Sequence, residues 1–277
     1  MKYLKEDNCI KVFSKDEFNP EHIFECGQIF SYEKQGKDYI VYASNKMAKV
    51  EEREDYYCIF TNHVDYFVNF FDLNTNYSNI KKQLLSQYPM LNNAIQFGYG
   101  MRILKHDYFE TIISFIVSAN NNIKRIQKIL FGIRQKYGTW MNGYYAFPTV
   151  EQLLDATEAD FKALGAGYRA KYLCEAVKYL NGKDINQYAK MSTPDLNKDL
   201  LNIMGVGQKV ADCIMLFAFS RQDVFPVDTW IEKVYCAYFN EEHNRGVIRK
   251  NLVSKFGNMS GYAQQYLFYF QRSDKHH

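Results

Sequence analysis

The sequence predicts an α+β fold in which an N-terminal antiparallel sheet domain precedes a helical domain. Short segments rich in Ile, Val, Tyr and Phe recur through the first part of the chain, whereas apolar residues at helical spacing dominate from Asn92 onward. Residues 196–219 read as a helix, a tight turn and a second helix. We place the boundary after residue 95, which gives domains 1–95 and 96–277.

The first domain contains five strand-like segments separated by turn residues, which predicts hairpins of an antiparallel sheet. These are residues 9–13, 28–32, 39–43, 47–50 and 56–61, followed by helix-like segments at 64–71 and 81–88. Gly27 interrupts one strand-like run, which indicates a bulge or a close backbone approach.

The second domain is predicted to be helical throughout. The expected helices are residues 107–119, 123–137, 149–156, 158–164, 169–180, 229–239, 244–256 and 261–272. The asparagines at 120–122 lie between two of them, and the pattern favours a capped junction over amides that contact a partner. Tyr168 and Arg169 are expected to project from a helix start after a glycine loop.

Composition limits the class of protein only broadly. The net charge of +3 and pI of about 8.3 permit a nucleic-acid partner without requiring one. Six cysteines without a C-x-x-C pair favour reduced thiols and argue against an iron–sulfur cluster or a zinc site. No apolar run has the length needed to span a bilayer, so we expect a soluble compartment and no membrane partner.

The stretch from Leu201 to Ser220 carries the chemistry. Gly205 and Gly207 allow a sharp reversal and leave backbone amides at the start of the second helix, where a phosphate can bind. Lys209 lies in the first turn of that helix, among apolar positions. Further on, Asp228 follows Pro226-Val227 and is expected to cap the next helix.

These residues resemble the helix-hairpin-helix superfamily of DNA base-excision glycosylases. Within it, the chain is similar to the 8-oxoguanine DNA glycosylase family over nearly its whole length. The resemblance is carried by Cys26-Gly-Gln-Ile-Phe-Ser-Tyr32, by Gly100-Met-Arg-Ile-Leu104 leading to Asn120-Asn-Asn-Ile-x-Arg125, by Gly165-x-Gly-Tyr-Arg-Ala-Lys-Tyr172 and by Gly261-Tyr-Ala-Gln-Gln-Tyr-Leu-Phe268. It implies a TBP-like sheet domain followed by a glycosylase domain in two helical lobes.

The resemblance also implies a bifunctional enzyme that flips 8-oxoguanine out of duplex DNA, cleaves its N-glycosidic bond and nicks the strand. Lys209 would attack the sugar C1′, because burial and a helix N-terminus both disfavour its charged ammonium form. Asp228 would stabilise the oxocarbenium character that develops at C1′.

Other roles are carried over position by position. The base pocket would comprise Gly27, Cys213, Phe217, Gln264 and Phe268, and the residues that read the opposite cytosine or fill the gap would be Asn120, Arg125, Tyr168 and Arg169. Phosphate would bind at Gly205, Val206, Gly207 and Gln208, and the carbonyls of Leu201, Ile203 and Val206 would suit a structural Na⁺ or K⁺ ion.

The expected partner is double-stranded DNA with 8-oxoguanine opposite cytosine, bound by a monomer that requires no cofactor. The expected location is the cytoplasm, at the nucleoid, in a prokaryote, or the nucleus in a eukaryote. Three features depart from the family pattern: Trp230 stands where relatives place a phosphate-contacting histidine, Phe217 replaces a flexible residue, and Tyr269-Phe-Gln271 lacks an acidic residue.

Three alternatives compete with this interpretation. A non-catalytic helix-hairpin-helix module would need the glycines but neither Lys209 nor Asp228. A monofunctional alkyl-purine glycosylase would keep the aspartate without a lysine nucleophile. An unrelated helical protein with a chance Gly-x-Gly would not share the other blocks.

Overall fold

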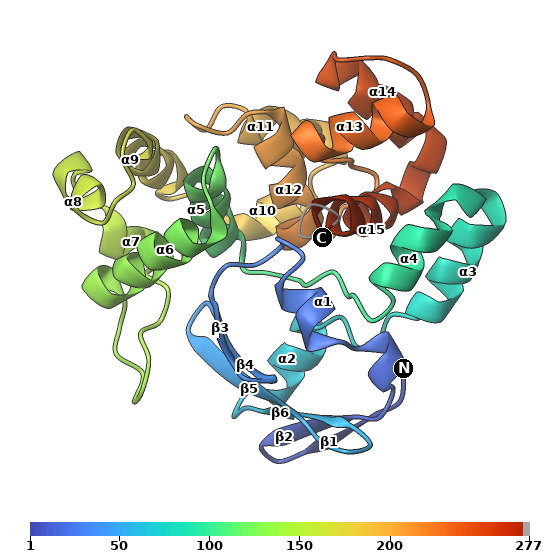
Figure 1. The fold of residues 1–277 in the computed structure, drawn as a ribbon. Coiled ribbons are helices and arrows are strands. Elements are labelled where there is room, and N and C mark those ends of the chain that lie inside the picture. Colours follow the sequence, from blue (N-terminus) through green and yellow to red (C-terminus); the bar gives the residue numbers. More distant parts are fainter. Residues whose placement is uncertain (274–277) are drawn as a thin grey trace. The chain divides into compact units, whose positions relative to one another are not determined.

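A computed structural model describes residues 1–273 and contains the predicted antiparallel sheet followed by helices (Figure 1). The sheet has six strands in the order β1-β2-β6-β5-β4-β3. Their bounds are β1 Tyr3–Glu6, β2 Cys9–Val12, β3 Tyr32–Gln35, β4 Asp38–Ala43, β5 Lys46–Glu52 and β6 Tyr57–Phe60. The α+β fold class is therefore confirmed.

The helices account for most of the remaining chain. They are α1 Pro20–Phe24, α2 Val64–Phe70, α3 Tyr77–Gln87, α4 Asn92–Phe97, α5 Tyr108–Ser118, α6 Ile123–Tyr137, α7 Val150–Leu153, α8 Glu158–Ala163, α9 Arg169–Leu180, α10 Ile185–Lys190, α11 Thr193–Leu200, α12 Gln208–Phe219, α13 Thr229–Tyr238, α14 Arg245–Phe256 and α15 Ser260–Ser273. Of the helices in residues 1–273, none has both the length and the apolar character to cross a membrane.

The chain forms two compact units, and each is discontinuous in sequence. The first unit contains Met1–Gln28, Val50–Lys105 and the described residues from Ser220 onward. The second unit contains Ile29–Lys49 and His106–Phe219. The boundary predicted after residue 95 stays a prediction.

The expected strand at 28–32 is wrong, because this segment is an irregular loop up to Tyr32. Gly27 has a φ of +85°, which turns the chain out of an extended path. The Gln28 side chain then donates to the carbonyls of Ile23 (2.8 Å) and Arg102 (2.7 Å) and accepts from the Leu104 amide (2.8 Å). Hydrogen bonds from the Gln28 side chain therefore take the place of the backbone pairing of a strand.

Sequence patterns also failed to indicate β1 and α1.

The expectation of six reduced thiols is wrong for Cys9 and Cys58, which form a disulfide. Strands β2 and β6 are antiparallel, with Cys9 opposite Phe60 and Lys11 opposite Cys58. The two cysteines are therefore diagonal neighbours on one face, with a Cα–Cα distance of 6.5 Å. Their separation of 49 residues in sequence gave no sign of this pairing.

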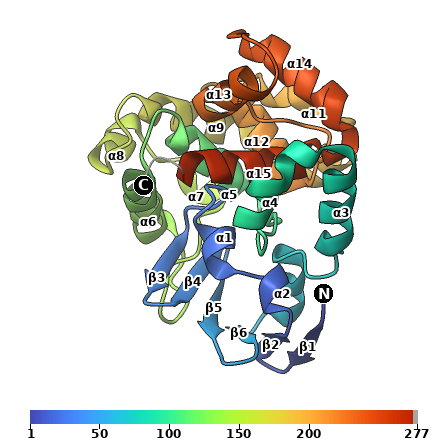
Figure 2. The same cartoon turned by 45° about the vertical axis from the view of Figure 1, so that its right-hand side comes forward.

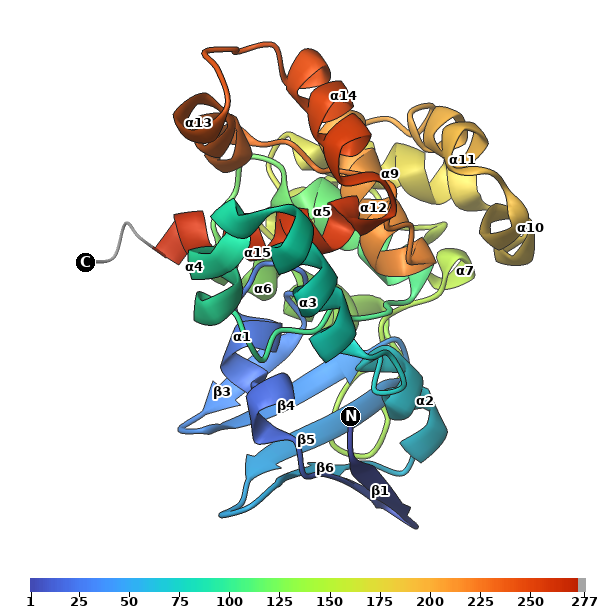
Figure 3. The same cartoon turned by 90° about the vertical axis from the view of Figure 1, so that its right-hand side faces the viewer.

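The core of the first unit lies among its helices. Helix α4 lies along α15 (Figure 2), and α13 and α14 also pack against α15 (Figure 3). Buried Phe225, Ile231, Leu252 and Tyr266 belong to this cluster. Arg102 is fully buried in the same unit, where it donates to the carbonyls of Phe71 (2.9 Å), Asp72 and Thr75 (3.1 Å). Its guanidinium thus satisfies backbone carbonyls that are not paired in the β-sheet.

A buried ion pair organises the second unit. Arg134 of α6 and Glu110 of α5 are both buried, and their Nη2 and Oε1 atoms are 2.5 Å apart. Glu110 also accepts from the Ser31 hydroxyl and the Ser44 amide, each at 2.7 Å, while Arg134 donates to the Tyr42 carbonyl at 3.2 Å. The pair therefore attaches the loops around β4 to two helices.

Replacing Glu110 by Gln should destabilise the protein by about 3 kcal/mol, because Arg134 would keep a buried charge without its counter-charge. Urea denaturation followed by circular dichroism measures this change. Glu158→Gln provides the control, since its ion pair with Lys162 is exposed and should contribute about 0.5 kcal/mol or less. Equal effects of the two substitutions would contradict an organising role for the buried pair.

Candidate active site

The hairpin turn in the second unit has the geometry expected from its glycines. The amide of Val206 donates to the Ile203 carbonyl at 3.0 Å, which closes the turn between α11 and α12. Gly205 has a φ of +89°, and a Cβ there would lie 2.8 Å from the Tyr172 side chain. At Gly207 a Cβ would meet no described atom within 4 Å, so that side of the turn is open to a partner.

Gln208 begins α12, and its side chain is engaged within the unit. Its amide nitrogen donates to Asn197 Oδ1 at 2.7 Å and to Asp212 Oδ1 at 3.1 Å. The amides around Gly207 and Gln208 stand at the N-terminus of a 12-residue helix, where the peptide dipoles favour an anion. Phosphate binding at this turn stays a prediction, and it would use backbone groups.

Lys209, Cys213 and Phe217 follow one another at intervals of four residues on α12, which brings them to one helix face. Lys209 is half-buried, and its Nζ lies 5.3 Å from the ring centroid of Phe115. Phe115 in turn stacks on Phe217, with centroids 5.5 Å apart and planes within 14°. The amine therefore lies over one ring of an aromatic stack, on the helix face that also carries Cys213.

Two more aromatic groups extend this stack, and sequence reasoning missed their role. Phe30 contacts Phe115 edge-on at 5.7 Å, and the imidazole of His106 contacts Phe217 edge-on at 6.4 Å. Burial lowers the pKa of His106 to about 3, so its ring is neutral at physiological pH.

Asp228 in the first unit is the N-cap of α13, as expected. Its Oδ1 accepts from the amides of Trp230 (2.9 Å) and Ile231 (3.0 Å). The cap thereby fixes the carboxylate at the helix start, and the residue is half-buried. One carboxylate oxygen makes the two capping bonds, which leaves Oδ2 for an additional interaction.

Gly27 and Phe268 come together in the first unit. A Cβ on Gly27 would lie 3.1 Å from Phe268 Cε1 and 2.7 Å from Arg272 Nη1, so only glycine fits without a shift. The loop is held on both sides, because Gln265 donates to the Cys26 carbonyl at 3.2 Å and Arg272 donates to the Glu25 carbonyl. The close backbone approach predicted at Gly27 is confirmed.

Gln264 on α15 is 4% exposed, and its Oε1 has no hydrogen-bond partner among the described residues. A buried acceptor without a donor is uncommon in folded proteins and indicates a group that a ligand satisfies. The predicted role of Gln264 in holding a base therefore has structural support, although it remains a prediction.

The residues assigned to the opposite base gather at one end of the second unit. Asn120 has a φ of +50°, Tyr168 is 55% exposed, and Arg125 donates to the Gly165 carbonyl at 2.9 Å. The capped junction expected here is confirmed, since Asn122 Oδ1 accepts from the Arg125 amide at 3.0 Å.

The projecting side chain expected at Arg169 is wrong. Arg169 is only 3% exposed, and it donates to the carbonyls of Ala119 (2.8 Å) and Asn120 (2.8 Å). The left-handed backbone at Asn120 turns these carbonyls toward the guanidinium. Arg169 thus holds the loop that presents Asn120, while the exposed Tyr168 ring lies 4.4 Å from the guanidinium carbon.

The candidate site residues are divided between the two units. Asp228, Gly27, Gln264 and Phe268 belong to the first, whereas Lys209, Cys213, Phe217 and the opposite-base group belong to the second. The convergence of Lys209 and Asp228 on one cavity stays a prediction.

Comparisons with known proteins identify the family of the chain. Residues 11–112 match the model of the 8-oxoguanine DNA glycosylase N-terminal domain, and residues 113–256 match the model of the HhH-GPD superfamily of base excision DNA repair proteins. The crystal structure of Clostridium acetobutylicum 8-oxoguanine glycosylase/lyase, in complex with dsDNA containing cytosine opposite 8-oxoG, is 37% identical, with a TM-score of 0.92 and 99% of each chain covered.

Curated relatives match over shorter stretches. The N-glycosylase/DNA lyase of Saccharomyces cerevisiae is 34% identical over 211 residues, which is 61% of this chain and 56% of that protein. A probable N-glycosylase/DNA lyase of Methanothermobacter thermautotrophicus is 32% identical over 208 residues, or 64% of this chain and 65% of that one. The chain thus spans less than two thirds of these relatives. From the two family models and the full-length structural match, we conclude that the chain belongs to the 8-oxoguanine DNA glycosylase family of helix-hairpin-helix base-excision repair proteins.

Proposed function

We propose that this protein is a bifunctional DNA glycosylase/AP lyase that excises 8-oxoguanine from duplex DNA in base excision repair. The observation that carries the proposal is Lys209 in the first turn of α12, in line with Cys213 and Phe217 on one face. A non-catalytic module has no use for an amine at this position. A monofunctional glycosylase that relies on water as its nucleophile has none either.

The reaction follows from the chemistry of the amine. The lone pair of Lys209 Nζ forms a bond to C1′ as the C1′–N9 bond breaks, and the departing purine takes up a proton. Opening of the sugar ring then gives an iminium ion between C1′ and Nζ. Loss of a C2′ proton expels the 3′ phosphate by β-elimination, which nicks the strand, and water releases the enzyme.

Asp228 is suited to stabilise the positive charge that develops at C1′. Its Oδ1 is held by the two amides at the start of α13, so the carboxylate is oriented before the substrate binds. The helix N-terminus also offers a favourable electrostatic setting for a negatively charged group. Capping and catalysis thus use different oxygens of one residue.

Recognition of the oxidised base would depend on the Gly27 carbonyl. 8-Oxoguanine carries a hydrogen on N7, whereas guanine does not, so one backbone acceptor distinguishes the two. The orphan Gln264 Oε1 would accept from the pairing edge of the flipped base. Cys213 and Phe268 would cover the two faces of the ring, and Phe217 would form a wall.

The opposite strand would be read by Asn120 and Arg125, with the exposed Tyr168 ring filling the gap in the stack. Arg169 supports this proposal through the Asn120 carbonyl. The Clostridium acetobutylicum relative was solved with cytosine opposite the lesion, which agrees with a preference for that base.

We further propose a monomer that needs no cofactor and works where chromosomal DNA lies, at the nucleoid or in the nucleus. A Na⁺ or K⁺ ion fits the hairpin as a structural element. The Ile203 carbonyl accepts the Val206 amide and keeps a second lone pair, and the neighbouring Leu201 and Val206 carbonyls would complete the oxygen set. This ion would stiffen the turn and takes no part in the reaction.

Borohydride added to enzyme and an 8-oxoguanine:C duplex should trap a covalent protein–DNA adduct, because it reduces the iminium ion. Lys209→Gln should abolish the adduct and strand nicking while DNA binding persists. Base release by the wild-type enzyme without any adduct would assign the protein to the monofunctional class.

Asp228→Asn should keep the cap and lower the single-turnover excision rate about 100-fold or more.

Gly27→Ala should abolish discrimination between 8-oxoguanine and guanine and destabilise the fold by about 2 kcal/mol, because the methyl group meets Phe268 and the backbone is left-handed. Gly36→Ala is the matched control. Its φ is +65°, but a Cβ there meets no described atom within 4 Å. Gly36→Ala therefore measures the cost of the left-handed backbone alone, without a steric clash. Thermal unfolding and single-turnover excision measure both effects. Equal behaviour of the two variants would remove Gly27 from the pocket.

Arg125→Ala should reduce the preference for cytosine over adenine opposite the lesion about tenfold, since a base-edge contact contributes about 1 to 3 kcal/mol. Lys128→Ala, on the same helix and also exposed, should leave the preference unchanged. Arg169→Ala should instead slow excision opposite every base, because Asn120 loses its support. Single-turnover rates on the four duplexes separate these outcomes, and an unaltered preference in Arg125→Ala would refute the assignment.

A further inference from the structure

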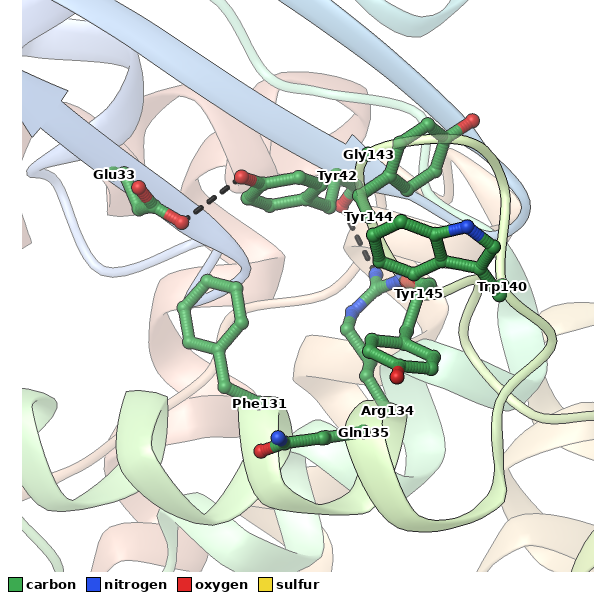
Figure 4. A pocket seen from close by; sticks show the side chains of 9 residues that line it. All are labelled: Glu33, Tyr42, Phe131, Arg134, Gln135, Trp140, Gly143, Tyr144 and Tyr145. Carbon is green, nitrogen blue, oxygen red and sulfur yellow. Dashed lines mark hydrogen bonds between the residues drawn. The ribbon is translucent and has the colours of Figure 1, made fainter.

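The second unit contains a cavity of about 250 Å³ whose lining shares no residue with the proposed active site. Five aromatic side chains and one carboxylate line most of it, from strands β3 and β4, helix α6 and the hairpin that follows α6 (Figure 4). These residues are Glu33, Tyr42, Phe131, Trp140, Tyr144 and Tyr145. Trp140 is 56% exposed, although exposing so large an apolar side chain to water is unfavourable.

The hairpin that carries three of these rings has a defined structure. Trp140 and Tyr145 form an antiparallel bridge, and the Met141 amide donates to the Tyr144 carbonyl at 2.8 Å. Asn142 and Gly143 both have positive φ, of 52° and 130°, as a two-residue reversal requires. The turn is therefore tight, and the rings project from a short ladder.

The hairpin is also attached to the rest of its unit. The Tyr144 hydroxyl donates to the Asn45 carbonyl at 2.9 Å, and the Phe147 amide donates to the Ser44 carbonyl at 2.8 Å. Arg134 Nη1 donates to the Tyr145 carbonyl at 3.2 Å. The cavity walls are thus positioned before any ligand arrives, which lowers the entropic cost of binding.

The rings meet at steep or tilted angles rather than in parallel stacks. Tyr42 packs edge-to-face with Phe131, with centroids 5.5 Å apart and planes at 89°, and lies 5.8 Å from Tyr144. Trp140 meets Tyr145 at 5.0 Å and 62°. Aromatic faces carry the negative part of the ring quadrupole, so a cavity lined by several aromatic rings suits a cation.

Of the two charged groups in the lining, Glu33 strengthens this attraction and Arg134 is neutralised by another residue. The guanidinium carbon of Arg134 lies 5.9 Å from the centroid of the Tyr42 ring, and its charge is compensated by the 2.5 Å ion pair with Glu110. Glu33 lines the cavity, and its carboxylate accepts from the Tyr42 hydroxyl at 2.9 Å. Burial and the neighbouring Glu33 raise the pKa of Tyr42, so the phenol keeps its proton and donates it in this hydrogen bond.

We propose that this cavity binds an organic cation, an alkylammonium or guanidinium group such as the end of a lysine or arginine side chain. Its volume lies below the range of about 300 to 1,000 Å³ that is common for drug-sized ligands, which suits a single cationic head group. The aromatic faces bind the charge and its methylene carbons, and Glu33 supplies the counter-charge.

Tryptophan fluorescence tests the proposal directly. The chain has two tryptophans, so Trp230→Phe leaves Trp140 as the reporter. Titration with choline should change the Trp140 emission, and 3,3-dimethylbutanol, its neutral isostere, should bind about tenfold more weakly. NaCl at matched ionic strength controls for screening. Equal binding of choline and its neutral isostere would overturn the proposal.

Two substitutions in this background locate the site. Glu33→Gln keeps an acceptor for the Tyr42 hydroxyl but removes the charge, and it should weaken choline binding about fivefold to tenfold. Tyr144→Leu should weaken it similarly by removing one ring face. Glu54→Gln, an exposed change of equal charge outside the lining, should have no effect. Unchanged affinity in both cavity variants, verified as folded by circular dichroism, would overturn the proposal.

The source of the cation can be distinguished with further probes. A partner protein as the source predicts that N-acetyl-lysine methylamide and N-acetyl-arginine methylamide bind at least as tightly as choline, and that a lysine-containing peptide binds more tightly. A free metabolite as the source predicts the reverse order, with choline or spermidine preferred. Binding of guanosine, a neutral stacking ligand, in preference to every cation would overturn the proposal.

Discussion

The contact between Gly205 and Tyr172 is the constraint on which the geometry of the second unit's site depends. The left-handed backbone at Gly205 lies against the tyrosine ring so closely that no Cβ fits. Tyr172 belongs to α9, whose first residue is Arg169, and the turn leads directly into α12 and Lys209. This packing contact therefore fixes the N-terminus of α12, which carries Lys209, relative to α9, which begins at Arg169.

Polar side chains in the family blocks divide between supporting the backbone and contacting a ligand. Arg169, Gln28 and Arg102 are buried and donate to carbonyls of irregular loops. Such loops cannot satisfy their own carbonyls, so each depends on one multivalent side chain. Arg169 matters because it holds the carbonyl of Asn120, whose backbone is left-handed, and Gln28 matters because it holds the loop that contains Gly27.

The sequence was informative where the relevant spacing is local. The helical spacing of apolar residues placed Lys209 in the first turn of α12, and the residue types at Asp228 and Asn122 indicated their caps. It was uninformative where a contact joins distant segments. Neither the Cys9–Cys58 pairing nor the burial of Arg169 has a local signature, because each depends on how separate elements pack. The Gly27–Phe268 contact was accessible only through family resemblance.

Buried polar residues that support the backbone differ from those that contact a ligand in whether their hydrogen-bonding atoms are already paired within the protein. Arg169 and Gln28 use their groups on the protein's own backbone, whereas Gln264 retains a buried oxygen without a donor among the described residues. Leaving that acceptor unsatisfied costs about 1 to 3 kcal/mol, which nothing in the described structure offsets. Such a cost is tolerable where a ligand supplies the missing donor. The N–H groups on the pairing edge of a flipped purine have the chemistry to do so, and a water molecule would serve in their absence.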